Sequence, residues 1–228
     1  MKALTTKPDL VVQVQQAIID AIVSGELLGG ERLTQEELAD RLGVSRQPIL
    51  QALVLLRDQG LIKDAPNRRG LIVAPLNAAF IRNLYELRSA LDGAAAAAAA
   101  RKADKIDRER GMKLLRQGNE AVLQRHSRLL VQADHAFHQF IYEASGNSLL
   151  IDSGARHWPH VRRAMATHLD HVESLERVWL EHEAILAAVL SGSARQAEKL
   201  SRSHAEKSLK LILSQIPDQP DSPAAVAA

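Results

Sequence analysis

The chain has 228 residues, enough for one large domain or two small ones. Hydrophobic residues make up 46% and charged residues 25%, a composition that excludes a largely disordered chain. The absence of cysteine excludes disulfides, zinc ribbons and thiol nucleophiles. The longest stretch without a charged side chain, residues 70–81, is too short for a transmembrane helix, which needs about 20 apolar residues. We therefore expect a cytoplasmic protein without a membrane partner.

The formal net charge is +2, and residues 1–75 contain nine lysines and arginines against nine aspartates and glutamates. This balance does not by itself indicate a nucleic-acid-binding protein. Any argument for DNA binding must therefore come from the positions of the basic side chains.

The first two helices are predicted by apolar spacing and by capping residues. Apolar residues at helical spacing predict a helix over about residues 10–22, before a break at residues 24–25. Thr34 stands three residues before Glu37, which is the spacing of a capping box. A second helix is therefore expected to begin there and to end near Arg41.

A third helix and a hairpin complete the N-terminal third. After a tight turn at residues 42–44, Ser45 is a suitable N-cap, and Pro48 is tolerated in the first helical turn. The buried stripe of this helix is Ile49, Ala52, Leu53 and Leu56. Short β-type runs at residues 61–63 and 71–73 predict a hairpin around residues 66–70. This order of elements predicts a winged helix-turn-helix domain over residues 1–75.

Residues 76–228 keep a helical period and predict an all-helical domain, so the fold class is mainly α. Breaks fall at residues 145–147 and 191–193. Pro159 is expected to kink or split its helix, and residues 217–228 are expected to be frayed. Six helices are predicted, near residues 77–101, 103–123, 127–145, 147–170, 173–190 and 193–214.

Residues 94–100 are a run of seven alanines. Alanine has the highest helix propensity, and its small side chain allows helices to pack closely. A low-complexity segment is the alternative, but Leu84, Leu87 and Leu91 precede the run at helical spacing and favour a packed helix.

The N-terminal residues resemble the GntR family of bacterial transcription regulators. The match runs in register over about residues 10–75, and its most specific part is GVSRQP at residues 43–48. The resemblance implies a recognition helix and a hairpin tip that bind double-stranded operator DNA. It implies DNA contacts by Arg46, Gln47, Gln51, Arg68, Arg69 and Gly70.

The third predicted helix also suits DNA reading on physical grounds. Its buried stripe leaves Arg46, Gln47, Leu50 and Gln51 on the opposite face. Arginine can bind guanine and glutamine can bind adenine in the major groove. The alternative is an ordinary solvated surface. Leu50-Gln51 replace the Arg-Glu pair that is common in the family, so one contact is missing and an apolar contact with a thymine methyl group can take its place.

Four polar side chains lie within apolar stripes of the C-terminal helices. The residues three, four and seven positions from His182 are all apolar, and His204 and Asp134 have similar neighbours. His138 stands one turn after Asp134. A single such histidine is usually an ordinary hydrogen-bonded core residue. A buried carboxylate needs a compensating partner. Four such groups on three helices therefore favour a shared divalent metal ion (Zn, Ni, Mn or Fe). The other histidines are expected at the surface: His126, His135, His157, His160, His168 and His171.

The C-terminal part resembles the ligand-binding domain called FCD, in the FadR-like branch of the GntR family. The resemblance covers about residues 77–210 and rests on the ordered runs DxxFH at 134–138, SGN at 145–147 and EHxxI at 181–185, followed by His204. It implies that the metal ligands are Asp134, His138, His182 and His204. Six helices rather than seven indicate the VanR-like subgroup.

Three residues are predicted to bind the effector. Arg88 lies on an apolar stripe, and an ion pair with Asp92 at i+4 is one interpretation. The resemblance implies instead that Arg88 and the metal ion together bind a carboxylate. Trp158 and Arg162 share one face of their predicted helix and are further candidates for the effector pocket.

The sequence therefore predicts a homodimeric transcription regulator, not an enzyme, that responds to a small carboxylate at a metal site, as a repressor or as an activator. One alternative is a regulator for which the metal ion itself is the signal. Another is a metal-dependent hydrolase, because three histidines and one aspartate can activate water. Against hydrolysis, no additional carboxylate occupies a suitable position for a general base, and an enzyme has no use for the DNA-binding helix.

Overall fold

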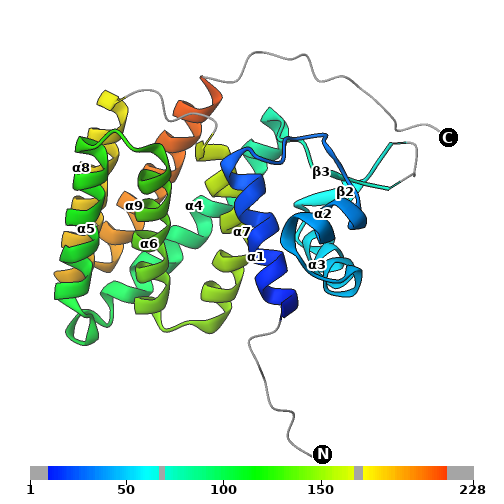
Figure 1. Cartoon of the computed structure of the whole chain (residues 1–228). Helices are drawn as coiled ribbons and strands as arrows, with labels where there is room; N and C mark the ends of the chain where they lie inside the picture. Colours follow the sequence, from blue (N-terminus) through cyan, green and yellow to red (C-terminus); the bar gives the residue numbers. More distant parts are fainter. Residues whose placement is uncertain (1–9, 67–69, 167–171, 215–228) are drawn as a thin grey trace, which may run out of the picture.

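The computed structural model describes residues 10–66, 70–166 and 172–214, which form an N-terminal part beside a larger helical part (Figure 1). The N-terminal part contains α1 (Leu10–Ser24), β1 (Arg32–Leu33), α2 (Gln35–Leu42), α3 (Arg46–Asp58), β2 (Ile62–Asp64) and β3 (Leu71–Val73). The C-terminal part contains α4 (Ala78–Ala100), the short 3-10 helix η1 (Ala103–Lys105), α5 (Arg108–Leu123), α6 (Ser127–Ser145), α7 (Ser148–Ala166), α8 (Val172–Leu190) and α9 (Ala194–Leu213).

The N-terminal part is the winged helix-turn-helix that the sequence predicts. The Thr34 hydroxyl caps α2 by accepting a hydrogen bond from the Glu37 amide, and Gly43 ends α2 in the left-handed conformation at φ 64°. The predicted hairpin is confirmed as β2 and β3, which pair antiparallel. Strand β1 was not predicted; it pairs with the other edge of β3 and gives the order β1-β3-β2. Two residues are too few to show an alternating pattern in sequence.

The six predicted C-terminal helices are confirmed as α4 to α9 among the described residues. Helix α4 packs against α6, α7, α8 and α9, and the alanine run lets α9 approach it closely. Five of these alanines are buried: Ala95, Ala96, Ala97, Ala99 and Ala100. The interpretation of a packed helix is therefore confirmed.

Two local predictions differ from the structure. The helix expected from residue 103 is interrupted, because Asp107 acts as the N-cap of α5 and its carboxylate accepts from the Arg110 amide. Pro159 was expected to kink or split its helix; the split is wrong, because α7 continues through this residue, and the kink stays a prediction. A proline inside a helix costs about 3 kcal/mol. The burial of Trp158, Pro159 and Val161 against neighbouring helices offsets that cost.

The apolar side chains form two main clusters. One joins α1, α2, α3 and the sheet, and the other joins α4, α5, α6, α8 and α9. Within the described ranges, no helix is long and apolar enough to cross a membrane. The predicted tail at residues 217–228 lies outside the described residues.

Candidate functional site

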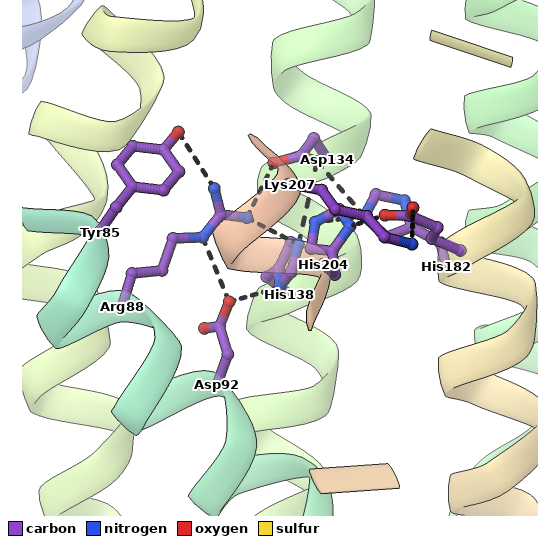
Figure 2. A network of polar contacts seen from close by, with 9 residues as sticks. Tyr85, Arg88, Asp92, Asp134, His138, His182, His204 and Lys207 are labelled. Carbon is purple, nitrogen blue, oxygen red and sulfur yellow. Dashed lines mark hydrogen bonds and ion pairs between the residues drawn. The ribbon is translucent and has the colours of Figure 1, made fainter. Parts of the chain in front are cut away.

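The four predicted metal ligands meet in the interior of the helical part. Asp134 and His138 come from α6, His182 from α8 and His204 from α9, and all four are buried (Figure 2). Each offers one ligand atom, and these atoms lie within 4.8 Å of one another. Nε2 of His182 lies 3.3 Å from Nε2 of His204 and 3.4 Å from Oδ1 of Asp134. The cluster therefore connects three helices at one point.

Two further carboxylates fix the orientation of the histidine rings. Nδ1 of His138 faces Oδ2 of Asp92 at 3.4 Å, and Nδ1 of His204 donates to Oε2 of Glu181 at 3.0 Å. Lys207 donates to the other Glu181 oxygen at 2.7 Å. Hydrogen bonds from His204 and Lys207 outweigh the effect of burial and hold the pKa of Glu181 below its usual value. With a proton on each Nδ1, the Nε2 lone pairs point toward the centre of the cluster, as metal-binding histidines require.

Two groups of the cluster each carry a buried atom that the described part of the chain leaves without a hydrogen-bond partner, on the ring or carboxylate that would hold a cation through its other atom. Oδ2 of Asp134 and Nδ1 of His182 have no hydrogen-bond partner among the described residues. Burial raises the pKa of Asp134, because a buried carboxylate without sufficient compensation favours its neutral form. A divalent cation would neutralise Asp134 and separate the converging Nε2 lone pairs. The donor set of one carboxylate and three imidazoles suits Zn, Ni, Mn or Fe.

Arg88 of α4 lies at the edge of the cluster. Its Nε donates to Oδ2 of Asp92 at 3.2 Å, so the predicted i+4 ion pair is present. Its Nη2 donates to Nε2 of His138 at 2.9 Å, and its Nη1 donates to the Tyr85 hydroxyl at 3.3 Å. Arg88 and a metal ion would compete for the His138 lone pair. Metal binding would therefore free one edge of the guanidinium to bind a carboxylate.

Trp158 and Arg162, the other predicted effector residues, lie on α7 and line the same cavity, but they contact different neighbours. The Trp158 ring lies 5.1 Å from the His138 ring and 5.0 Å from the guanidinium carbon of Arg88. Arg162 instead pairs with Asp20 of α1 at 3.2 Å. Trp158 therefore contacts the metal cluster, whereas Arg162 contacts the N-terminal part.

A cavity of about 340 Å³ lies between the two parts of the chain. Trp158 lies between this cavity and the metal cluster, because it lines the cavity and its ring contacts that of His138. The His135 ring, which also lines the cavity, packs on Trp158. Its walls come from α1, α6 and α7 and include Gln15, Gln16, Ile19, Gln139, Tyr142 and Arg162. Any ligand in it would contact both parts of the chain.

The surface assignment was wrong for His160, and His135 is only partly exposed. His160 is only 4% exposed, and its Nε2 donates to the backbone carbonyl of Gln59 at 2.8 Å. His135 packs on Trp158, and burial followed by the charge of Arg162 lowers its pKa to about 4. Both contacts are made across the fold by residues far apart in sequence. His168 and His171 lie outside the described residues.

Metal-free protein should lose stability as the pH falls below about 6.5. Burial lowers the pKa of His138 and His182 well below 6.5 and that of His135 to about 4. As the pH falls, the unfolded chain, whose histidines have ordinary pKa values near 6.5, takes up protons before the folded chain does. The free energy of unfolding therefore decreases as the pH falls. His135 alone contributes about 2 kcal/mol between pH 8 and pH 5. The raised pKa of Asp134 changes the free energy of unfolding in the opposite direction, but Asp134 is a single group and the pKa is lowered for these three histidines.

Urea unfolding of chelator-treated protein at pH 8, 6.5 and 5 would measure this effect. An unfolding free energy that is equal or larger at pH 5 would contradict it. With metal present the dependence should be steeper, because the imidazoles must be neutral to bind the ion.

The predicted DNA-contacting residues of α3 lie on its solvent-facing side. Gln47 and Gln51 are exposed, and Arg46 pairs with Glu36 of α2 at 2.8 Å on the surface. Gly70 adopts φ 91°, a conformation that favours glycine at the end of the hairpin loop. Arg68 and Arg69 lie outside the described residues.

Comparison with known proteins assigns the family. The profile "Bacterial regulatory proteins, gntR family" matches residues 10–73, and the profile "FCD domain" matches residues 83–207. The chain belongs to the GntR family. Its FCD domain places this GntR regulator in the FadR-like branch, as the sequence indicates, and the GntR helix-turn-helix makes it a DNA-binding transcription regulator.

Similar regulators cover most of the chain. LutR of Bacillus subtilis (strain 168) is 29% identical over 208 residues, which are 80% of this chain and 92% of LutR. The transcriptional repressor RspR of Escherichia coli (strain K12) is 26% identical over 195 residues, which are 86% of this chain and 85% of RspR. Among solved structures, E. coli McbR/YncC has a TM-score of 0.80 at 18% identity and covers 93% of this chain and 99% of its own. At this level of identity, the similarity shows only that this GntR regulator shares the fold.

Proposed function

We propose that this regulator senses a small carboxylate at a metal site in its FCD domain. The observation that carries the proposal is the convergence of Asp134, His138, His182 and His204 within 4.8 Å in a buried position. When bound, the ion would supply a Lewis-acidic position for a ligand oxygen. Arg88 beside it would bind the other oxygen of the carboxylate.

Helix α7 connects this site to the DNA-binding part. Trp158 contacts the His138 ring. Within the next five residues, His160 donates to the Gln59 carbonyl, Arg162 pairs with Asp20, and Arg163 donates to the Ala74 carbonyl. A ligand that displaces Trp158 would therefore alter contacts that hold the helix-turn-helix. Coupling between two sites requires such a difference in contacts between two states.

We further propose that the protein is a cytoplasmic, homodimeric repressor without enzymatic activity. The relative RspR is named as a repressor, which supports repression by analogy. Helix-turn-helix dimers bind operators whose two half-sites mirror the symmetry of the protein. Against hydrolysis, Asp92 and Glu181 are each engaged by a histidine ring nitrogen and by a cationic side chain, so neither is available as a general base. Six FCD helices in the described chain support the VanR-like subgroup.

The ligand proposal predicts a thermal shift. Protein loaded with Zn²⁺ or Ni²⁺ should melt about 5–10 °C higher when a fitting carboxylate is present at 100 times its Kd. The corresponding amide should have little effect, because it lacks the charge that Arg88 and the ion bind. Arg88→Gln should remove the shift without removing the metal. If no acid in a panel of small mono- and dicarboxylates shifts the melting temperature of metal-loaded protein, carboxylate sensing is contradicted.

A sensor of the metal ion itself is the second candidate. The nearly complete burial of His182 and His204 favours it, because a closed site with four protein ligands leaves little space for an effector. The operator affinity of metal-loaded and chelator-treated protein, each with and without the acid that gives a thermal shift, separates the two functions. A pure metal sensor changes affinity with the metal alone.

The DNA-binding helix gives a separate prediction. Arg46→Ala should weaken operator binding by about 1–3 kcal/mol and relax the base preference at one position. Arg57→Ala on the same helix, which removes an exposed pair with Asp64, is the matched control. Gel shifts with the operator and with single-base variants would measure both. Equal affinity and equal preference for Arg46→Ala and wild type would exclude a base contact by Arg46.

A further inference from the structure

The solvent-facing side of α3 carries an apolar patch. Leu50 is 48% exposed and Val54 is 52% exposed, whereas their neighbours Ile49 and Leu53 are buried in the core. Leu50 and Val54 are four residues apart, so they lie one above the other on the same side of the helix. Two exposed apolar side chains are common on a protein surface, so their meaning depends on the residues around them.

The residues around this patch identify the partner. Arg46 lies one turn before Leu50 on the same stripe, and Gln47 and Gln51 lie beside it. These are the side chains that read guanine and adenine in the major groove. Leu50 is therefore placed among the base-reading groups of the helix, where a bound duplex presents base edges rather than phosphates. The only apolar group on a major-groove base edge is the C5 methyl of thymine.

We propose that Leu50, with Val54 beside it, reads the methyl group of a thymine in each operator half-site. The inference rests on DNA binding by α3 and goes beyond it, because it assigns one base and one functional group. It provides discrimination between thymine and cytosine, since cytosine carries no methyl at C5 and presents a hydrogen-bond donor instead. An arginine or glutamate at this position would select a different base edge.

The test removes the same methyl contact from either side. Operator duplexes are first selected by wild-type protein from a random-sequence pool, and each thymine of a half-site is then replaced by uracil, which lacks only the methyl. One replacement should weaken wild-type binding about fourfold, which corresponds to about 0.8 kcal/mol for one buried methyl group. Leu50→Ala should bind the thymine operator at least fourfold more weakly and should show no further loss with uracil.

Leu55→Ala is the matched control. Leu55 is also exposed, at 42%, but it lies about 140° around α3 from Leu50. This variant should keep the fourfold sensitivity to uracil. Circular dichroism should show that both variants are folded, since neither side chain belongs to the core.

Three results would overturn the inference. Wild-type protein could be insensitive to every thymine-to-uracil replacement, or Leu50→Ala could keep the wild-type sensitivity. Leu50→Ala could also change the oligomeric state in light scattering without any dependence on the methyl, in which case a second copy covers the patch. If wild-type protein selects no duplex, DNA binding itself fails, whereas a selected operator without methyl sensitivity contradicts the reading by Leu50 alone.

Discussion

His182→Ala is expected to release the metal ion and to lower the melting temperature by about 5–10 °C or more. His182 is completely buried on α8 and contributes one of four ligand atoms. A ligand present at 100 times its Kd stabilises the native state by about 2.7 kcal/mol, and 1 kcal/mol corresponds to about 2–4 °C for a chain of this size. The cavity left by the imidazole adds to this loss. Elemental analysis of protein purified without chelator, together with thermal unfolding, would measure both effects.

Asp134→Asn separates loss of metal from loss of packing. The asparagine has nearly the same shape, so no cavity forms, but it removes the negative charge from the ligand set. In metal-loaded protein this change should be destabilising. In chelator-treated protein it should be neutral or stabilising, because burial disfavours the charged form of Asp134. A substitution that destabilises the metal-loaded protein but not the metal-free protein is specific to a site that holds a cation.

The control is His157→Ala, because the His157 ring bonds to the backbone carbonyl of Ser153 within its own helix. This variant should keep the metal. If wild-type protein neither carries nor takes up a metal ion, and the Asp134 and His182 variants melt like wild type with and without chelator, the four residues are a packed polar cluster.

Helical periodicity was sufficient to find the centre of the candidate site. His182 and His204 are polar positions within apolar stripes, and a stripe of that kind must face the core, as the structure shows. Asp134 and His138 are one turn apart, so a single helix brings them together. The cap at Thr34 and the turn at Gly43 are equally local, which explains why the bounds of α2 follow from sequence.

The second layer of the site did not follow from sequence. Asp92 meets His138 from another helix, and the Tyr142 hydroxyl donates to Asp92 at 2.8 Å across fifty positions of sequence. Local sequence patterns do not predict which helices become neighbours in the fold. The ion pair of Asp92 with Arg88 was predicted, because the two residues are four positions apart on one helix. The contact of Glu181 with the ring of His204 spans two helices and was not. The contact of His160 with Gln59 was missed for the same reason, since it joins the two parts of the chain.

Arg163→Ala is expected to weaken the coupling between DNA binding and the metal site. Arg163 is buried on α7 and donates to the backbone carbonyl of Ala74, in the connection between β3 and α4. Burial lowers the pKa of Arg163, but the guanidinium remains charged at neutral pH. Its removal leaves the partly buried Ala74 carbonyl without this donor and should cost about 1 kcal/mol of stability. The metal content should stay unchanged, because Arg163 contributes no ligand.

The measurement is the ratio of operator affinities of metal-loaded and chelator-treated protein. Allosteric coupling energies of about 1–3 kcal/mol correspond to a ratio of roughly 5 to 150 in wild type. In Arg163→Ala the ratio should fall below the wild-type value, because one of the three contacts that join α7 to the DNA-binding part is gone, while those of His160 and Arg162 remain. Arg156→Ala is the matched control: Arg156 is also on α7 and pairs with Asp58 of α3, but at the exposed surface, where such pairs contribute little. If Arg163→Ala keeps the wild-type ratio with full metal content, the signal does not pass through this contact.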